Sequence, residues 1–325
     1  MVKRQGRRVV LAAAAALAAP GVLRAQGAYP QRSVRVINAY SPGGTADVVC
    51  RIIFGRLSER LGQQSVTENR PGAAGTIAAS AVARAPADGY TLLYDATAHS
   101  VNPSLFGTRL PYDTQRDLLP VFLSMVTPNT LHSTNGFEAR TVPELIALAK
   151  AKPGQLDCCS TGIGTVQHVS LELLNHMAGV WINHIAYRDI SAARNDLVSG
   201  RVPLQFSNVP GSVPFLQSGI ARVMAHCGPR PVAVLPDIPA IAETLPGFET
   251  YEWNGVFAPS GTPDAIIGQV NAELNAVIRD PATIERLSGL GALTRANTPE
   301  EFGAFREQQI AFFTGMVRLA NIRID

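Results

Sequence analysis

The sequence of 325 residues lacks the short patterns by which many enzymes and metal proteins are recognised. It has no C-x-x-C spacing, no H-E-x-x-H pair and no G-x-S-x-G turn, and its six histidines are scattered without ligand spacing. These absences argue against thiol redox sites, metal sites and hydrolases. Gly162-Ile163-Gly164 imitates part of a dinucleotide fingerprint, but Gln167 stands where its third glycine belongs. We therefore expect no catalytic residue, no metal and no cofactor.

Charged residues are also scarce, at 16% of the chain, whereas hydrophobic residues make up 46%. That composition is typical of a globular protein with a large core, and the length favours two domains. The formal net charge of +3 falls to −2 without five basic residues near the N-terminus, which are Lys3, Arg4, Arg7, Arg8 and Arg24. The folded body therefore has no basic excess of the kind that binds nucleic acid.

Cysteine is limited to Cys50, Cys158, Cys159 and Cys227. An exported protein could join two of them in a disulfide. However, Cys50 is expected on the apolar side of a helix, and Cys158 and Cys159 are neighbours in a strand, where adjacent side chains point to opposite faces. We therefore favour buried thiols that pack as small apolar groups, with a disulfide as the open alternative.

Residues 1–27 have the features of an export signal. A basic segment precedes an alanine-rich apolar run, and Ala25-Gln26-Gly27 supplies small residues for a cleavage site. The apolar run is too short and too rich in alanine for a membrane span. We predict an exported protein that is periplasmic in a Gram-negative host. Adjacent Arg7 and Arg8 leave the Sec and twin-arginine routes both open.

A glycine-rich turn at residues 40–47, here called the first turn, joins a predicted strand over 34–39 to a predicted helix over 47–61. Its proline and two glycines favour a tight bend that a ligand can approach closely. Thr45 is expected to cap the helix, and Asp47 to lie in its first turn, where the helix dipole favours a carboxylate. Unpaired N–H groups at such a helix end suit an anion, unless the glycines only shape the turn.

A second turn, residues 161–165, has the same strand-turn-helix setting farther along the chain. Strands and helices alternate throughout with short Gly and Pro punctuation, which predicts an α/β protein with mostly parallel sheets. We divide the mature chain into a discontinuous first domain, residues 28–127 plus 251–325, and a second domain, residues 128–250. Two crossings between them would form a hinge with a ligand cleft.

Several polar residues are predicted near strand ends, where α/β proteins bind their ligands. His99 lies in a predicted loop from Thr97 to Ser100, and His168 lies in the first turn of the helix after the second turn. Each histidine could contact a ligand or simply pack against its neighbours. Arg188 suits a carboxylate because a guanidinium can form two parallel hydrogen bonds, although a solvent-facing arginine is equally compatible.

Motifs along nearly all of the mature chain resemble those of the Bug (TctC-like) family, the solute-binding proteins of tripartite tricarboxylate transporters. In chain order they are Tyr29-Pro30, Ser41-Pro42-Gly43-Gly44-Thr45-Ala46-Asp47, Glu68-Asn69-Arg70-Pro71-Gly72-Ala73-Ala74-Gly75, Ala87-Asp88-Gly89-Tyr90-Thr91-Leu92-Leu93, Leu110-Pro111-Tyr112-Asp113, Glu144-Leu145-Ile146-Ala147-Leu148-Ala149-Lys150, Gly162-Ile163-Gly164-Thr165, Leu235-Pro236-Asp237-Ile238-Pro239 and Trp253-Asn254-Gly255-Val256-Phe257-Ala258-Pro259. Each motif is modest alone, but their order is specific.

This resemblance implies an α/β, two-domain periplasmic binding protein of the Venus-flytrap, type II-like class. It also implies that backbone N–H groups and hydroxyls of the two turns hold a ligand carboxylate. The implied contacts of the first domain are Ser41, Gly43, Gly44, Thr45, Asp47, Thr97, His99 and Ser100. Those of the second domain are Thr161, Gly164, Thr165, His168, Tyr187, Arg188 and Asn208. Asp47 would read an amine or hydroxyl of the ligand.

One departure from the family pattern lies at Asp189. The family usually has Pro-Tyr-Lys/Arg-Gly where this chain has Ala186-Tyr187-Arg188-Asp189. Replacement of the glycine by Asp189 is expected to narrow the pocket or repel an acid.

The resemblance implies a monomeric, non-enzymatic receptor that captures a small carboxylate and presents it to the membrane subunits of a transporter. A receptor that reports its ligand to a membrane signalling protein is the alternative. An enzyme on the same fold is a third, less favoured hypothesis.

Overall fold

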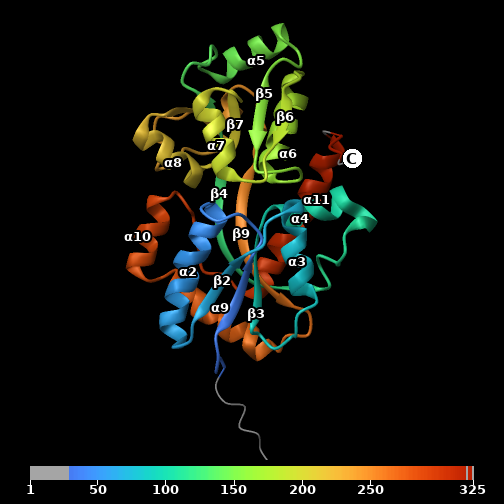
Figure 1. The fold of residues 1–325 in the computed structure, drawn as a ribbon, viewed down its shortest axis with the longest axis vertical. Helices are drawn as coiled ribbons and strands as arrows, with labels where there is room; N and C mark the ends of the chain where they lie inside the picture. The colour runs from blue at the N-terminus through green and yellow to red at the C-terminus, as the bar shows by residue number, and fades with distance from the viewer. Residues whose placement is uncertain (1–28, 320, 324–325) are drawn as a thin grey trace, which may run out of the picture.

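The protein forms two lobes stacked along its long axis, each with a sheet flanked by helices (Figure 1). The computed structural model describes residues 29–319 and 321–323, so the predicted export signal lies outside the described residues. We call the lobe with β1, β2 and β3 the lower lobe and the lobe with β5, β6 and β7 the upper lobe, as in Figure 1. The predicted α/β fold is confirmed.

The lower lobe is built mainly from the two ends of the chain. Its strands are β1 (Val34–Asn38), β2 (Ser65–Asn69) and β3 (Thr91–Ala96). Its helical segments are α2 (Thr45–Leu61), η1 (Ala73–Gly75), α3 (Thr76–Ala83), α4 (Ala98–Phe106), η2 (Gly107–Arg109), α9 (Asp264–Val277), α10 (Pro281–Gly289) and α11 (Pro299–Leu319).

The upper lobe is built from the middle of the chain. Its strands are β5 (Asp157–Ser160), β6 (Asn183–Ala186), β7 (Leu204–Asn208) and β8 (Ala221–His226). Its helical segments are α5 (Val142–Ala151), α6 (Val166–Ala178), α7 (Ile190–Ser199), α8 (Val209–Ser218) and η3 (Ile241–Glu243).

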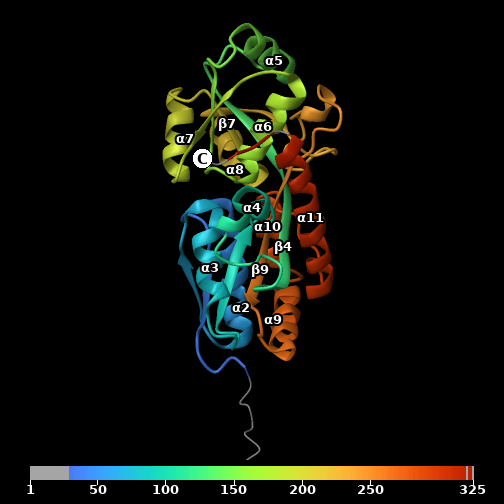
Figure 2. The ribbon, with the colours of Figure 1, turned by 90° about the vertical axis from the view of Figure 1, so that its right-hand side faces the viewer.

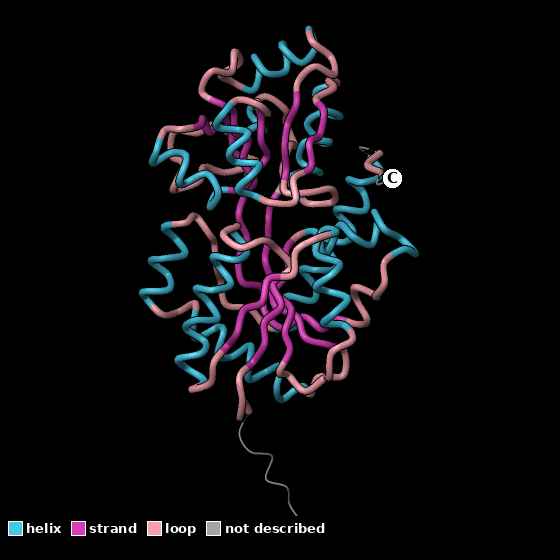
Figure 3. Tube along the Cα trace, in the orientation of Figure 1, coloured by secondary structure: helices cyan, strands magenta, loops and turns pink. Residues whose placement is uncertain are grey.

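Two long strands, β4 (Leu118–Thr134) and β9 (Tyr251–Pro259), connect the lobes (Figure 3). The sheet order is β2-β1-β3-β9-β4-β7-β5-β6, with β8 also paired to β4. The strands β1, β2 and β3 pair parallel, as do β5, β6 and β7, but β4 and β9 are antiparallel to all their neighbours. The sheet is therefore mixed, and the expectation of mostly parallel pairing is corrected, because one crossing strand leaves the lower lobe and the other returns to it.

Apolar periodicity explains how each lobe acquires its own core. In α2, the fully buried Val49, Ile53 and Leu57 recur at helical spacing and face the sheet of the lower lobe. A separate cluster around Leu145 and Phe206 fills the upper lobe. The domain boundaries proposed from the sequence remain a prediction.

The last helix joins the two lobes as a third connection. Figure 2 shows α11 running along one side of both lobes. Near its C-terminal end, Phe313 and Val317 pack with Leu105 of α4 and Val169 of α6 in one apolar cluster. Contacts on this side therefore hold α4 of the lower lobe beside α6 of the upper lobe.

One helix was mistaken for a loop in the sequence. The segment from Thr97 to Ser100 opens α4, because Ser100 N–H already bonds to the Thr97 carbonyl. The helix contains Pro103 and lacks a clear apolar stripe, which conceals it from pattern analysis.

Candidate functional site

A cavity of about 1000 Å³ lies between the lobes, at the upper end of the usual size of ligand pockets. Elements of both lobes line it. Of the residues predicted as contacts, the lining includes Ser41, Gly44, Thr45, Thr97, Thr161, Thr165, Tyr187, Arg188 and Asn208. The remaining predicted contacts, Gly43, Asp47, His99, Ser100, Gly164 and His168, do not belong to the lining.

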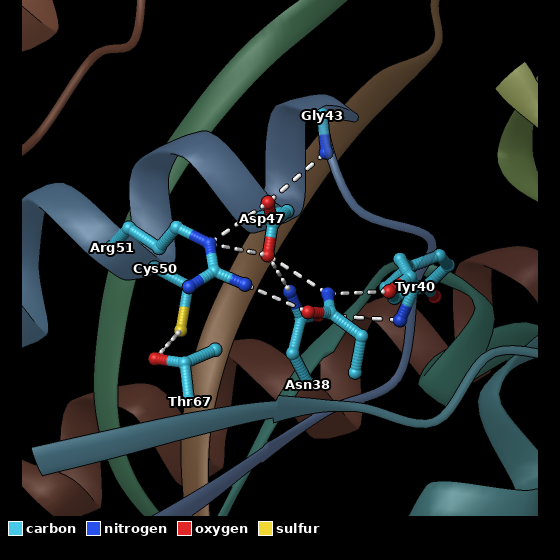
Figure 4. Close-up of polar contacts among 8 residues, drawn as sticks. Asn38, Tyr40, Gly43, Asp47, Cys50, Arg51 and Thr67 are labelled. Atoms are coloured by element: carbon cyan, nitrogen blue, oxygen red, sulfur yellow. Dashed lines mark hydrogen bonds and ion pairs between the residues drawn. The ribbon is translucent and has the colours of Figure 1, made fainter. Parts of the chain in front are cut away.

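Asp47 holds the first turn together through its polar contacts (Figure 4) and is not among the residues that line the cavity. Its carboxylate accepts hydrogen bonds from Gly43 N at 3.0 Å, from Arg51 Nε at 3.0 Å and from Asn69 Nδ2 at 2.8 Å. Burial raises the pKa of Asp47, but these bonds outweigh that effect and the pKa is lowered. The structure therefore gives no support to Asp47 as a reader of the ligand.

Thr45 does not cap α2. The N-cap residue is Gly44, and no side chain bonds to the first amides of this helix. The N–H groups of Thr45 and Ala46 belong to its first turn, where a helix offers no acceptor, and both residues line the cavity. A partly positive helix end is thus open toward the cavity.

The second turn presents a matching helix end from the upper lobe. Thr165 caps α6, since its hydroxyl accepts from His168 N and donates to the Gly162 carbonyl at 2.8 Å. Val166 and Gln167 follow in the first helical turn, and both line the cavity. The first turns of two helices from different lobes therefore line one cavity, an arrangement that suits a carboxylate group.

The lobes touch each other on both sides of the cavity. On the α2 side, Ser41 Oγ donates to the Arg188 carbonyl at 3.2 Å, and Thr45 Oγ1 donates to Asn208 Oδ1 at 2.8 Å. On the α4 side, Gly164 approaches Leu105 so closely that a Cβ would stand 3.1 Å from its Cδ1. The hydroxyls of the first turn thus bridge the cleft.

Glu252 of β9 is a cavity residue that the sequence reasoning missed. It is 7% exposed, and its Oε2 accepts from Gln167 Nε2 at 2.6 Å and from Asn208 Nδ2 at 2.7 Å. Burial raises its pKa despite these donors. Only the neighbouring Trp253-Asn254-Gly255 motif drew attention to this strand, and no local pattern shows that Glu252 faces the cleft.

His99 is a core residue. It is fully buried, its ring stacks on Phe257 with centroids 4.2 Å apart, and its Nδ1 lies 3.2 Å from Asp95 Oδ2. Burial lowers its pKa, so the neutral ring is favoured. The adjacent Ser100 is also fully buried. Neither lines the cavity, because the start of α4 turns both side chains into the lower lobe.

His168 stabilises the second turn through a hydrogen bond to its backbone and does not line the cavity. Its Nδ1 accepts from Gly164 N at 3.2 Å, and its ring stacks on His184 with centroids 4.0 Å apart. Burial and the neighbouring His168 lower the pKa of His184 to about 3. His168 therefore fixes the conformation of Gly164, and the amide of that glycine is already used.

Tyr187, Arg188 and Asp189, which follow β6, differ in the groups that surround them. The Tyr187 hydroxyl donates to the Asp196 carboxylate, and this bond raises the pKa of Tyr187 to about 12. Arg188 is exposed at the cavity wall. Asp189 caps α7 through Ser191 N at 2.6 Å and is absent from the lining, so the structure does not bear out repulsion of an acid by Asp189. The capping bonds lower the pKa of Asp189.

Arg194 and several apolar side chains in the lining were also missed by the sequence reasoning. Arg194 and Ile190 lie one helical turn apart on α7 and both reach the cavity. Ile77 and Ile163 line it as well, although each is about half exposed, at 53% and 47%. The four-residue spacing of Ile190 and Arg194 is a helical signal that the sequence shows, but only the packing shows that this face of α7 meets the cleft.

The remaining chemistry is sparse. All four cysteines are buried and free, which agrees with the preferred interpretation of buried thiols. Within residues 29–319 and 321–323, no cluster of His, Cys, Asp and Glu could hold a metal ion. In the same part of the chain, no helix is long and apolar enough to cross a membrane.

Comparison with known proteins agrees with the motif resemblance. A model described as the tripartite tricarboxylate transporter family receptor matches residues 49–311. The chain is 38% identical over 299 residues to the UPF0065 protein in the tcbD-tcbE intergenic region of Pseudomonas sp. strain P51. That alignment covers 91% of this chain and 89% of the relative.

Two solved structures with bound acids have similar folds. The structure of R. palustris Rpa4515 with adipate is 34% identical, with a TM-score of 0.87, and covers 91% of this chain and 99% of that one. MatC from Rhodopseudomonas palustris with bound malate is 30% identical, with a TM-score of 0.84, and covers 89% of this chain and 100% of that one.

Proposed function

Because the chain belongs to the tripartite tricarboxylate transporter receptor family, we propose that it is a periplasmic receptor that closes its two lobes on a small carboxylated metabolite. The family and the similar structures are binding proteins, and the function proposed is capture without chemical change. The two similar structures contain adipate and malate, which are both carboxylates.

One observation carries this proposal. The first helical turns of α2 and α6 point into one cavity from opposite lobes, and no side chain caps α2. Such helix ends stabilise an anion through N–H donors and the helix dipole. A carboxylate held by both turns would connect the lobes and favour the closed arrangement.

Calorimetric titration and thermal unfolding of the purified protein, each with malate, adipate, amino acids and aromatic acids, test the proposal. We expect at least one carboxylate to bind with one-to-one stoichiometry and to raise the melting temperature, because a ligand of the folded state stabilises it. If no carboxylate in the panel binds, the proposed function is wrong.

Export and delivery complete the proposed role. Residues 1–27 would direct the chain to the periplasm, and the closed receptor would present its ligand to the membrane subunits of a transporter. Fractionation of cells that produce the full chain tests export, with a processed protein in the periplasmic fraction as the expected result. Loss of ligand uptake on deletion of the gene would support delivery, whereas normal uptake with loss of a transcriptional response would favour the sensing alternative.

A further inference from the structure

Arg194 lines the cavity close to Ser207 and Asn208 of the upper lobe, where Thr45 of the lower lobe also reaches Asn208. A Cβ on Gly211 would stand 2.5 Å from Ser207 Oγ, 3.1 Å from Asn208 Oδ1 and 3.8 Å from Arg194 Nη2. The absence of a side chain at Gly211 therefore lets the Ser207 hydroxyl and the Asn208 amide lie against the backbone of α8, with the Arg194 guanidinium close by. Arg194, Ser207 and Asn208 all belong to the cavity lining.

The guanidinium of Arg194 is partly buried and lacks a counterion. Within residues 29–319 and 321–323, it has no hydrogen-bond or ion-pair partner, and burial alone lowers its pKa. The Ser207 hydroxyl has no hydrogen-bond partner in that part of the chain either. A partly desolvated cation without a partner is costly, and an anion that enters the cavity would remove the cost.

The other charged groups near Arg194 do not supply that anion. Among the described residues that line the cavity, Glu252 is the one carboxyl group, and its Oε2 is directed at Gln167 and Asn208. Asp189, one residue before α7, is directed at the amides that open this helix. The guanidinium of Arg194 is therefore available to bind an anionic group of a ligand.

We propose that Arg194, together with Ser207, binds a second carboxylate of the ligand, so that the preferred ligand class is a dicarboxylate. This inference rests on the proposed function, because the first carboxylate is assigned to the turns at the starts of α2 and α6. A cavity of about 1000 Å³ has room for an apolar chain between two acid groups. Ile163 and Ile190 line its wall and suit the methylene groups of such a chain.

Paired titrations test the role of Arg194. The ligands are succinate, adipate and suberate, each compared with the monocarboxylate of the same length, which is butyrate, hexanoate or octanoate. We expect the best dicarboxylate to bind the natural protein about tenfold or more tightly than its partner, as one charge-assisted contact should provide. In Arg194→Gln the dicarboxylate should lose about that factor, and the monocarboxylate should change by less than about twofold.

Three further variants give the test its controls. Arg194→Lys keeps the charge without the planar fork and should retain part of the preference. Arg201→Gln removes an exposed arginine that lies just after α7, outside the cavity, and should leave both affinities unchanged. Arg188→Gln asks whether the other arginine of the upper-lobe wall carries the preference instead.

The outcomes separate this inference from the proposed function. Equal weakening of both acids in Arg194→Gln, an unchanged preference, or loss of the preference in Arg188→Gln alone would each overturn the assignment to Arg194 while leaving a carboxylate receptor in place. Failure of every mono- and dicarboxylate to bind the natural protein would overturn both.

Discussion

Glu252 and Asp47 are two carboxyl groups near the cleft whose pKa values shift in opposite directions. Burial dominates at Glu252 and raises its pKa, because its donors are neutral amides. At Asp47 burial also acts, but the bonds from Arg51, Gly43 and Asn69 outweigh it and the pKa is lowered. The surroundings of Glu252 at the cavity therefore disfavour its charged form, whereas those of Asp47 in the first turn stabilise its charged form.

Replacement of Glu252 by Gln should change how stability depends on pH. Because the folded-state pKa is raised above the unfolded value of about 4.3, the natural protein loses stability as the pH rises from about 4 through the folded pKa. Both hydrogen bonds meet Oε2, so the amide oxygen of Gln can accept both. Urea unfolding at about pH 4 and about pH 8 should show that the variant gains stability relative to the natural protein at the higher pH. A difference that is independent of pH would contradict this expectation.

The backbone amide of Gly44 can be removed without breaking the turn. Gly44 has φ −76°, which proline can adopt, and its N–H makes only a long 3.4 Å bond to the Ser41 carbonyl. Gly44→Pro should therefore fold and should bind the carboxylate ligand about tenfold more weakly, as expected for a lost bond to a charged group. Titration calorimetry measures this loss.

Gly44→Ala is the matched control. Its Cβ would lie 3.5 Å from the Ser41 carbonyl oxygen, an ordinary contact, and its amide remains. It should lose much less affinity than Gly44→Pro. Natural affinity in a folded Gly44→Pro protein would exclude this amide as a principal contact.

Strand β9 is constrained at both edges by neighbouring strands and on one face by α11. It pairs with β3 on one edge and β4 on the other, and Gly255 lies under the fully buried ring of Phe302 from α11. A Cβ at Gly255 would meet Phe302 Cε1 at 2.8 Å and its Cζ even more closely. The strand that connects the lobes therefore needs a glycine to admit the last helix.

Gly255→Ala should destabilise the fold by about 1–3 kcal/mol, the usual cost of overpacking a core. Gly268→Ala, on an exposed position of α9 with open space around it, should instead stabilise by about 0.5–1 kcal/mol through helix propensity. Denaturant unfolding of both variants measures the two effects. Equal stability of the two variants would argue against close packing between β9 and α11.

At the scale of the whole molecule, the lobes are held together in two different ways. Apolar packing of α11 with α4 and α6 joins them on one side. On the α2 side the connection is polar, through the Ser41 and Thr45 hydroxyls. Polar bonds at a cleft exchange readily with water, so we expect the α2 side to open when the receptor releases its ligand.

Thr45→Val should weaken closure because it keeps the shape of Thr45 and removes the bond to Asn208. One net hydrogen bond of about 0.5–1.5 kcal/mol corresponds to an affinity loss of about two- to tenfold. Small-angle scattering of the ligand-free protein should show a larger radius of gyration for Thr45→Val than for Thr45→Ser, which keeps the hydroxyl. Identical scattering and affinity in the two variants would contradict a closing role.

The local chemistry of the chain accounts for what could be predicted from the sequence alone. Glycine-rich turns between strands and helices form because glycine tolerates a positive φ, and the threonine caps of α5, α6 and α11 form because a hydroxyl accepts the backbone N–H three positions along the chain. The α/β fold and the family follow from the order of these local signals, and both are confirmed.

Tertiary structure alone decided which side chains enter the cleft. His99 and His168 are at the predicted places in the sequence, yet packing turns both away from the cavity. Glu252 and Arg194 carry no local signature and reach the cavity because β9 and α7 pack around it. Periodicity tells which residues share one face of an element, but the partner of that face is set by long-range packing, which a single sequence does not encode locally.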